Sequence, residues 1–144
     1  MSIKQISVFL ENKPSALQGM CEALAGANID MRALSLAEAS DFGIARIIVD
    51  KLYEASQALK DAGLVCTVTP VVAAAIPDTS GGLGKVLGTL SAAGINVDYM
   101  YAFLGGPDAE HAYMILKTAD PARTAMVLKA NGITVLDQQD IEAL

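Results

Sequence analysis

The sequence predicts an α+β fold of two modules, each an antiparallel sheet with helices on one face and the element order βαββαβ. Two observations support this prediction. A helical pattern recurs at an offset of 66 residues, and strand-like runs stand before and after both copies of it. With 144 residues, 53% of them hydrophobic, the chain is long enough for one ordinary core or two small ones.

The repeat is clearest in the first helix of each copy, where SALQGMCEALAGANIDM superposes on GGLGKVLGTLSAAGINV. Positions 17, 20, 21 and 24 are apolar at helical spacing, and positions 83, 86, 87 and 90 repeat that stripe. An offset of 68 matches GANID with GINVD, but it opposes Leu24 to Ala92 and breaks the stripe. The offset of 66 pairs Asn28 with Gly94, which predicts a left-handed residue at each helix exit.

Strands are expected around each of these helices. Alternating residues 5–10 predict the first strand of copy one, and the run 71–76 is its counterpart in copy two. The second strands are the runs 31–39 and 97–105, and the third strands are the runs 44–50 and 112–118. Turn residues 40–43 and 106–111 separate them, so each pair should form a hairpin.

A second helix and a last strand complete each copy. Asp120 before Pro121 is a helix start signal, and Asp50 occupies the similar place in copy one. Gly63 and Gly132 should end these helices, before final strands at 64–68 and 133–137. This order is the ferredoxin-like arrangement, in modules 1–70 and 71–144. They meet at Pro70 with almost no linker, so we expect them to pack together.

Composition and charge disfavour several classes of function. A net charge of -6 with scattered basic residues is unsuited to nucleic acid or an anionic membrane. No apolar run is long enough for a membrane span, and the N-terminus lacks signal-peptide features, so a cytoplasmic location is expected. Tyr99, Tyr101 and Phe103 should share one sheet side, as packing more than as recognition. The third strands lack the aromatics of RNA-recognition domains.

Catalytic and metal chemistry find little support in the sequence. Cys21 and Cys66 form no CxxC and are expected to be buried reduced thiols, with a disulfide or metal pair as the alternative. His111 is the single histidine, expected as a solvated loop residue, with ligand contact as the alternative. No nucleophile and base set accompanies it. We therefore expect no enzyme activity, no cofactor and no metal site.

The stretch DTSGGLGKV, residues 78–86, suggests a phosphate loop but fails its spacing. Thr79 stands where the first glycine belongs, and Val86 stands where the magnesium-binding hydroxyl belongs. A glycine-rich turn that leads into a helix still presents unpaired N–H groups at the positive end of the helix dipole. A carboxylate is therefore the expected ligand group, although Gly81 and Gly82 can also be only a tight turn.

These loops and helix exits resemble the ACT domain, a small ligand-binding module attached to many enzymes of amino-acid metabolism. The family pattern is an acidic residue, a variable residue, proline, glycine and leucine before the helix, and glycine, aliphatic, asparagine, aliphatic after it. Copy one reads ENKPSAL and ANIDM, with Ser15 for the glycine and Asp30 for the asparagine. Copy two reads DTSGGL and AGINV, with Ser80 for the proline.

The resemblance implies a site in which the helix-exit residues of one module face the loop of another. For Asp30 and Asn96, turn capping at the strand start is the alternative. The ligand-binding residues it implies are Asn12, Ser15, Ala16, Leu17, Asp30, Asp78, Ser80, Gly81, Gly82, Leu83, Ile95 and Asn96. Because Ser15 replaces a glycine, the two copies should bind unequally.

Two hypotheses for function remain open. The first is a regulatory protein that binds an amino acid at the interface between ACT modules and modulates a partner enzyme or regulator. The second is an oligomerisation or interaction module that binds no ligand. A homodimer is expected under either, because the modules present open sheet edges and apolar faces.

Overall fold

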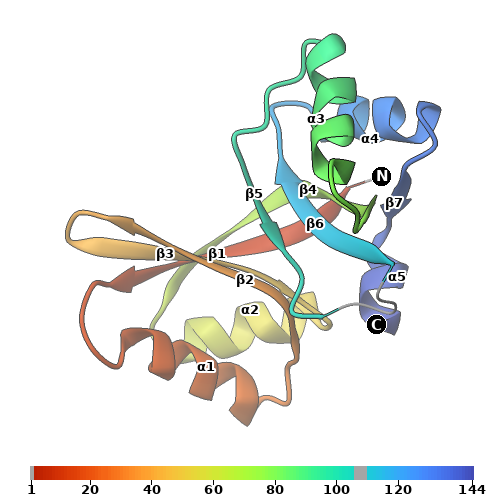
Figure 1. The fold of residues 1–144 in the computed structure, drawn as a ribbon. Coiled ribbons are helices and arrows are strands. Elements are labelled where there is room, and N and C mark those ends of the chain that lie inside the picture. The colour runs from red at the N-terminus through yellow and green to blue at the C-terminus, as the bar shows by residue number, and fades with distance from the viewer. Residues whose placement is uncertain (1, 106–109) are drawn as a thin grey trace. The chain divides into compact units, whose positions relative to one another are not determined.

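The computed structural model describes residues 2–105 and 110–144 of the chain (Figure 1). They fold into two compact units: an N-terminal unit, Lys4–Thr69, and a C-terminal unit, Pro70–Leu144 together with the first residues of the chain. The elements in chain order are β1 (Ile3–Glu11), α1 (Ala16–Gly26), β2 (Met31–Ala39), β3 (Phe42–Val49), α2 (Leu52–Asp61), β4 (Val65–Pro77), α3 (Gly82–Ala92), β5 (Tyr99–Ala102), β6 (His111–Lys117), α4 (Pro121–Ala130), β7 (Thr134–Leu136) and α5 (Gln138–Ala143).

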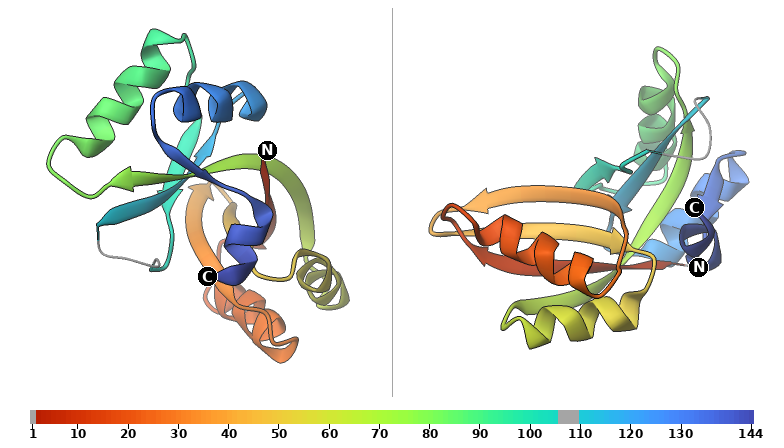
Figure 2. Two further views of the ribbon diagram at one scale, coloured as in Figure 1. Left: turned by 90° about the vertical axis from the view of Figure 1, so that its right-hand side faces the viewer. Right: turned by 90° about the horizontal axis from the view of Figure 1, so that it is seen from below.

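The N-terminal unit has the strand order β2-β3-β1-β4, with β3 antiparallel to both of its neighbours. Its two helices, α1 and α2, cover one face of this sheet (Figures 1 and 2). Ile6 and Val8 of β1 pack there in one core with Met20 and Leu24 of α1 and Leu59 of α2. This is the predicted ferredoxin-like arrangement, and the apolar stripe of the first helix is confirmed.

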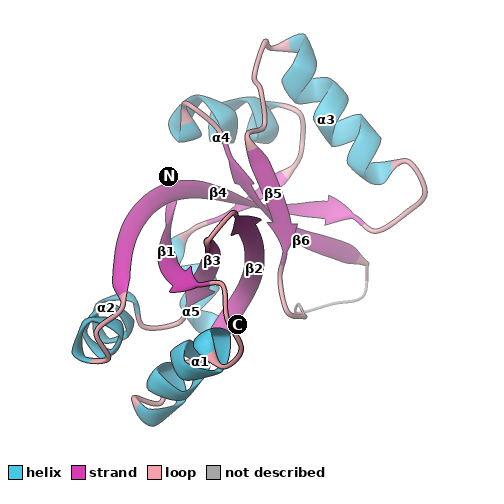
Figure 3. Cartoon of the chain, turned by 90° about the vertical axis from the view of Figure 1, so that its left-hand side faces the viewer, coloured by secondary structure: helices cyan, strands magenta, loops and turns pink. Residues whose placement is uncertain are grey.

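The C-terminal unit repeats the arrangement with the order β7-β4-β6-β5, and all three of these strand pairs are antiparallel. Its helices α3 and α4 lie on one face (Figure 3). Val86 and Leu90 of α3 pack in its core with Leu128 of α4. Leu83, expected in the same stripe, is 41% exposed. Gly82 is buried against the end of the preceding strand. Because successive residues of an α-helix point in different directions, Leu83 then faces outward.

Strand β4 differs from the expected pair of strands at 64–68 and 71–76. A single strand of 13 residues, Val65–Pro77, runs through Pro70 and belongs to both units. Pro70 is exposed, and proline is tolerated in a strand where no ladder hydrogen bond needs its missing N–H. The last strand of copy one and the first strand of copy two are therefore continuous.

The second helices start differently in the two units. Asp120 caps α4 as predicted, accepting a hydrogen bond from the backbone N–H of Arg123 at 3.1 Å. The prediction for Asp50 is wrong, because the residue before α2 is Lys51, whose side chain makes no capping bond. The Asp50 carboxylate instead accepts from the backbone N–H of Asp30 at 3.0 Å, and so joins the exit of α1 to the end of β3.

The helix exits follow the sequence prediction. Asn28 and Gly94 have φ of 57° and 73°, so both adopt the left-handed conformation expected at paired positions. Gly63 and Gly132, with φ of 78° and 77°, end α2 and α4 in the same way. Glycine reaches this conformation without penalty, and asparagine is among the residues that tolerate it best.

The second hairpin and the C-terminus depart from expectation. Strand β5 is shorter than the predicted run 97–105, and His111 is the first residue of β6 instead of a loop residue. Most of the predicted turn 106–111 lies outside the described residues. Helix α5 was not predicted. It is held by a capping box in which Asp137 and Asp140 each accept the other's backbone N–H at 2.9 Å, and it buries Ile141.

Candidate functional site

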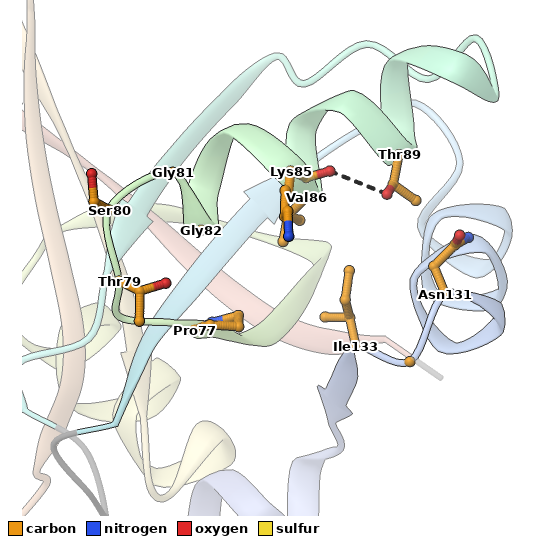
Figure 4. A pocket seen from close by; sticks show the side chains of 11 residues that line it. Pro77, Thr79, Ser80, Gly81, Gly82, Lys85, Val86, Thr89, Asn131 and Ile133 are labelled. Atoms are coloured by element: carbon orange, nitrogen blue, oxygen red, sulfur yellow. Dashed lines mark hydrogen bonds between the residues drawn. The ribbon is translucent and has the colours of Figure 1, made fainter.

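A pocket of about 500 Å³ opens beside the start of α3 in the C-terminal unit (Figure 4). Three parts of the unit form its walls: the loop after β4, one face of α3, and the exit of α4. The lining residues are Pro77, Thr79, Ser80, Gly81, Gly82, Lys85, Val86, Thr89, Asn131, Gly132 and Ile133. The pocket therefore combines the predicted glycine loop with residues at the exit of α4, about 50 positions later in the chain.

The two glycines of the loop are favoured at their positions for different structural reasons. Gly81 precedes α3 with φ of 82°, a left-handed conformation that L side chains rarely adopt. A Cβ on Gly82 would lie 2.2 Å from the carbonyl oxygen of Pro77, so that position has no space for a side chain. The N–H of Gly82 donates to the Thr79 carbonyl at 2.9 Å. The backbone is thus folded tightly against the end of β4.

Some backbone N–H groups in the first turn of α3 have no hydrogen-bond acceptor among the described residues. The N–H of Gly82 is bonded as described, and the N–H of Lys85 donates to the Gly81 carbonyl at 3.1 Å. No side chain caps this helix, and the N–H groups of Leu83 and Gly84 donate to no group of the described chain. Free N–H groups at the positive end of a helix dipole attract anions.

The charges around the pocket favour an anion as well. Lys85 is the single charged side chain among its lining residues, and no carboxylate of residues 2–105 or 110–144 pairs with it. Figure 4 shows Lys85 and Val86 extending from α3 toward Pro77 and Ile133, while the Ser80 hydroxyl points away from them. The pocket therefore presents an uncompensated positive charge.

Neutral polar groups complete the wall opposite the loop. The Thr89 hydroxyl donates to the Lys85 carbonyl at 3.1 Å, one turn along α3 (Figure 4). The Asn131 side chain donates from Nδ2 to the Val127 carbonyl at 2.8 Å. Because that bond fixes the orientation of the amide, its Oδ1 is left as an acceptor. The pocket thus offers an acceptor in addition to its donors.

The N-terminal unit has a smaller pocket, about 250 Å³, at the matching loop. It is lined by Leu10, Glu11, Asn12, Lys13, Ala16, Leu17, Leu36, Ala37, Glu38 and Gly43. Two carboxylates line it, and Lys13 already pairs with Glu11 at 3.2 Å. Ser15 takes the position of Gly81, with a similar φ of 75°. The backbone is alike in the two loops, but the charge of the two pockets is opposite.

The structure divides the loop residues predicted to bind ligand between these two pockets. Ser80, Gly81 and Gly82 line the larger pocket, and Asn12, Ala16 and Leu17 line the smaller one. Ser15, Asp78 and Leu83 lie in the same loops and helix starts but line neither pocket. The N–H of Asp78 donates to the Glu110 carbonyl at 2.8 Å, and that of Asn12 donates to the Asp41 carbonyl at 3.2 Å. Both loops are thus tied to the neighbouring hairpin.

The helix-exit residues lie away from the loop of their own unit. Helix α3 has 11 residues, so Ile95 and Asn96 are separated from Gly82 by about 16 Å or more along its axis. Asn96 donates from Nδ2 to the Asp98 carboxylate at 3.2 Å. Asp30, at the exit of α1, forms an ion pair with Arg32. Within a single unit, loop and exit residues do not meet.

Sequence reasoning missed several residues of the larger pocket. The sequence pattern places Lys85 only in a phosphate loop whose spacing fails, and it indicates no ligand-binding role for Thr89, Asn131 or Ile133. Lys85 and Thr89 are four residues apart, so they lie on one face of α3. That spacing indicates that both side chains can line the same pocket. Asn131 and Ile133 reach the pocket through the packing of α4 beside α3, and no local pattern indicates that.

Other predicted features are placed outside both pockets. Cys21 and Cys66 are free, half-buried, and packed against the N-terminal core. The rings of Tyr99 and Tyr101 stack with centroids 6.4 Å apart. Within the described ranges, no three potential metal ligands gather, and no helix is long and apolar enough to cross a membrane.

Solved structures with this fold include close and distant matches. A crystal structure of a protein from Bacteroides thetaiotaomicron is 38% identical, with a TM-score of 0.91 over 100% of this chain and 98% of that one. The ligand-free regulatory subunit of aspartate kinase from Thermus thermophilus is 15% identical, with a TM-score of 0.66 over 88% and 90% of the two chains. The corresponding subunit from Thermus flavus is also 15% identical, with a TM-score of 0.62 over 97% and 90%.

The comparison of sequences agrees with the repeat and with the fold. No curated protein matches this chain significantly. The sequence profile of the ACT domain pair matches residues 1–144, the whole chain. ACT domain pairs are regulatory modules, and the ferredoxin-like units described above are the fold that such a pair requires. The chain therefore belongs to the ACT domain pair family.

Proposed function

We propose that this chain is a regulatory protein of two modules, residues 1–70 and 71–144, that binds an amino acid and modulates a partner enzyme or regulator. The observation that carries the proposal is the pocket beside the start of α3, whose lining residues include one cation, Lys85, and no carboxylate. Membership in the ACT domain pair family supports it. So does the fold shared with regulatory subunits of aspartate kinase.

The amino acid's carboxylate binds at the start of α3. The N–H groups of Leu83 and Gly84, which lie in the chain between the lining residues Gly82 and Lys85, donate to no group within the described ranges. An anion at a helix N-terminus is stabilised by about 0.3–1 kcal/mol through the dipole. A Cβ on Gly81 would meet no atom within 4 Å, so the backbone of the loop is open to a close approach at that residue.

The amino acid's ammonium requires an acceptor, and the same pocket supplies one. Asn131 Oδ1 is available because Nδ2 of that side chain is bonded to the Val127 carbonyl. Pro77, Val86 and Ile133 provide apolar contacts for a ligand side chain. Polar groups placed to pair with both ends of a zwitterion favour amino acids over simple carboxylic acids.

The family resemblance implies that helix-exit residues of another module complete such a site. We propose that a second copy of the chain supplies them, in a homodimer, through Asp30, Ile95 or Asn96. Size-exclusion chromatography with light scattering tests this by measuring the mass in solution, with and without ligand. A mass of 15.0 kDa under all conditions would contradict the homodimer.

A thermal-shift screen of the twenty amino acids, followed by calorimetry, tests ligand binding. A ligand present at about 100 times its dissociation constant adds about 2.7 kcal/mol to the free energy of unfolding. Gly81→Ser places a side chain in the pocket wall and should weaken binding about tenfold or more. Ser15→Gly is the matched control in the other unit and should leave the dissociation constant unchanged. A flat panel for the wild type would contradict amino-acid binding.

The second candidate function is an oligomerisation or interaction module that binds no ligand. One observation favours this function for the N-terminal unit. The pocket there has two carboxylates and a lysine that is already paired, so it does not suit the carboxylate of an amino acid. A protein that binds no amino acid but is retained by a partner enzyme in a pull-down would support this candidate.

A further inference from the structure

Strand β2 forms an edge of the sheet in the N-terminal unit. It has nine residues, Met31–Ala39, pairs with β3 on one side, and pairs with no strand of the described residues on the other. Alternate residues of such a strand direct N–H and C=O groups away from their own sheet. The sheet of the C-terminal unit instead ends in β5 and β7, of four and three residues. Natural edges are often protected by being short, and β2 lacks this protection.

The residues along this edge do not block the addition of another strand. After a register shift at its start, β2 pairs regularly with β3 as far as Ala39. Residues 33–37 include no proline, glycine or charge. Leu34 packs against the core, whereas Leu36, on the same face of the strand, is 54% exposed. A regular edge strand with an exposed leucine is suited to pairing with a further strand.

The sequence of the edge is symmetric about Ser35. From Arg32 to Glu38 it reads RALSLAE, so alanine and leucine recur at equal distances from the serine, and the two ends carry opposite charges. A two-fold axis through Ser35 would place β2 of a second copy antiparallel to this strand, with each residue opposite its symmetric counterpart. Leu34 would then face the partner's Leu36, and Arg32 would face the partner's Glu38.

Neighbouring registers about a two-fold axis are less favourable. An axis one residue earlier, through Leu34, opposes Arg32 to the partner's Leu36. An axis one residue later, through Leu36, opposes Glu38 to the partner's Leu34. Of these three axes, only the one through Ser35 pairs leucine with leucine and opposite charges with each other. Cross-strand pairs of both kinds stabilise a sheet.

The charged residues at the two ends can form this pair. Glu38 is exposed and forms no ion pair with the described residues. Arg32 already pairs with Asp30 of its own chain. Because a guanidinium has five N–H donors, it can bind a second carboxylate without losing the first.

We propose that β2 pairs with β2 of a second copy of the chain, antiparallel about a two-fold axis through Ser35. This inference rests on the homodimer of the proposed function, and it names the interface. Backbone hydrogen bonds between the two edges supply the affinity, and the symmetric side chains set the register. The two N-terminal sheets become continuous, and the exposed Leu36 is covered.

Exchanging charges in the full chain tests this interface. Sedimentation velocity measures the dissociation constant of the dimer for Glu38→Arg and Arg32→Glu, separately and as a mixture. Each variant alone opposes like charges twice in its dimer, so its dissociation constant should rise about tenfold or more. In the mixture, opposite charges face each other again, so heterodimers should form with an affinity close to that of the wild type. Glu54→Arg changes the net charge equally at an exposed position of α2 and should leave the constant unchanged.

A second variant covers the case in which Arg32→Glu, which loses the pair with Asp30, does not fold by circular dichroism. Leu36→Asp places a carboxylate opposite the partner's Leu34 and should also weaken the dimer about tenfold or more. A dimer that neither Glu38→Arg nor Leu36→Asp weakens would overturn the inference and leave the homodimer intact, with its interface elsewhere. Folded variants that do not recover affinity when mixed would overturn the register. A wild-type mass of 15.0 kDa at every concentration would overturn both the interface and the homodimer, whereas amino-acid binding is decided separately by calorimetry.

Discussion

Exchanging the residues before α1 and α3 should change stability in opposite directions. Ser15 and Gly81 occupy equivalent positions with φ of 75° and 82°. An L residue in this region costs about 1–2 kcal/mol, and glycine loses about 0.5–1 kcal/mol more backbone entropy on folding. Ser15→Gly should therefore stabilise the protein by about 0.5–1 kcal/mol, and Gly81→Ser should destabilise it by a similar amount.

Neither exchange removes a contact that complicates this estimate. The Ser15 side chain makes no capping bond to α1, and a Cβ on Gly81 meets no atom within 4 Å. For a chain of this size the expected change in melting temperature is about 1–4 °C, upward for Ser15→Gly and downward for Gly81→Ser. Differential scanning calorimetry measures both, and the double variant should return close to the wild type. A lower melting temperature for Ser15→Gly would refute the assignment of backbone strain to this position.

Three further substitutions test the packing and capping of the C-terminal unit by urea denaturation. Gly82→Ala places a Cβ against the Pro77 carbonyl, 2.2 Å away, and should lower the free energy of unfolding by about 1–3 kcal/mol; a neutral result would mean that the loop adjusts freely. Asp120→Ala removes the cap of α4 and should lower it by about 1 kcal/mol, with an unchanged value contradicting the bond to Arg123. Leu128→Ala empties a fully buried position and should lower it by about 2–5 kcal/mol, so that a loss below 1 kcal/mol would contradict the core assignment.

Local sequence chemistry was sufficient to predict much of the fold. The offset of 66 residues placed Asn28 opposite Gly94, and both have the left-handed conformation at a helix exit. Asp120 caps α4 as its type and position indicate. Each of these features depends on residues within one turn of the chain, which explains why the sequence alone was sufficient.

Features that depend on distant residues were missed. Asp50 looks like a helix cap, but its carboxylate bonds to the N–H of Asp30, 20 positions earlier. The loop half of the larger pocket was predicted because its glycines are visible in the sequence. The other half comes from Asn131 and Ile133, which reach the pocket by the packing of two helices. Helix α5 carried a usable signal, since Asp137 and Asp140 have the spacing of a capping box.

The shared strand β4 affects how this chain could be divided experimentally. Residues Val72–Pro77 pair with β6 inside the sheet of the C-terminal unit, whereas the earlier part of the same strand is the edge of the sheet in the N-terminal unit. Proteases cut exposed loops much faster than hydrogen-bonded strands, and the boundary at Thr69 and Pro70 lies within a strand. Limited digestion should therefore not release the two modules as intact fragments, although two independent domains joined by a linker would separate.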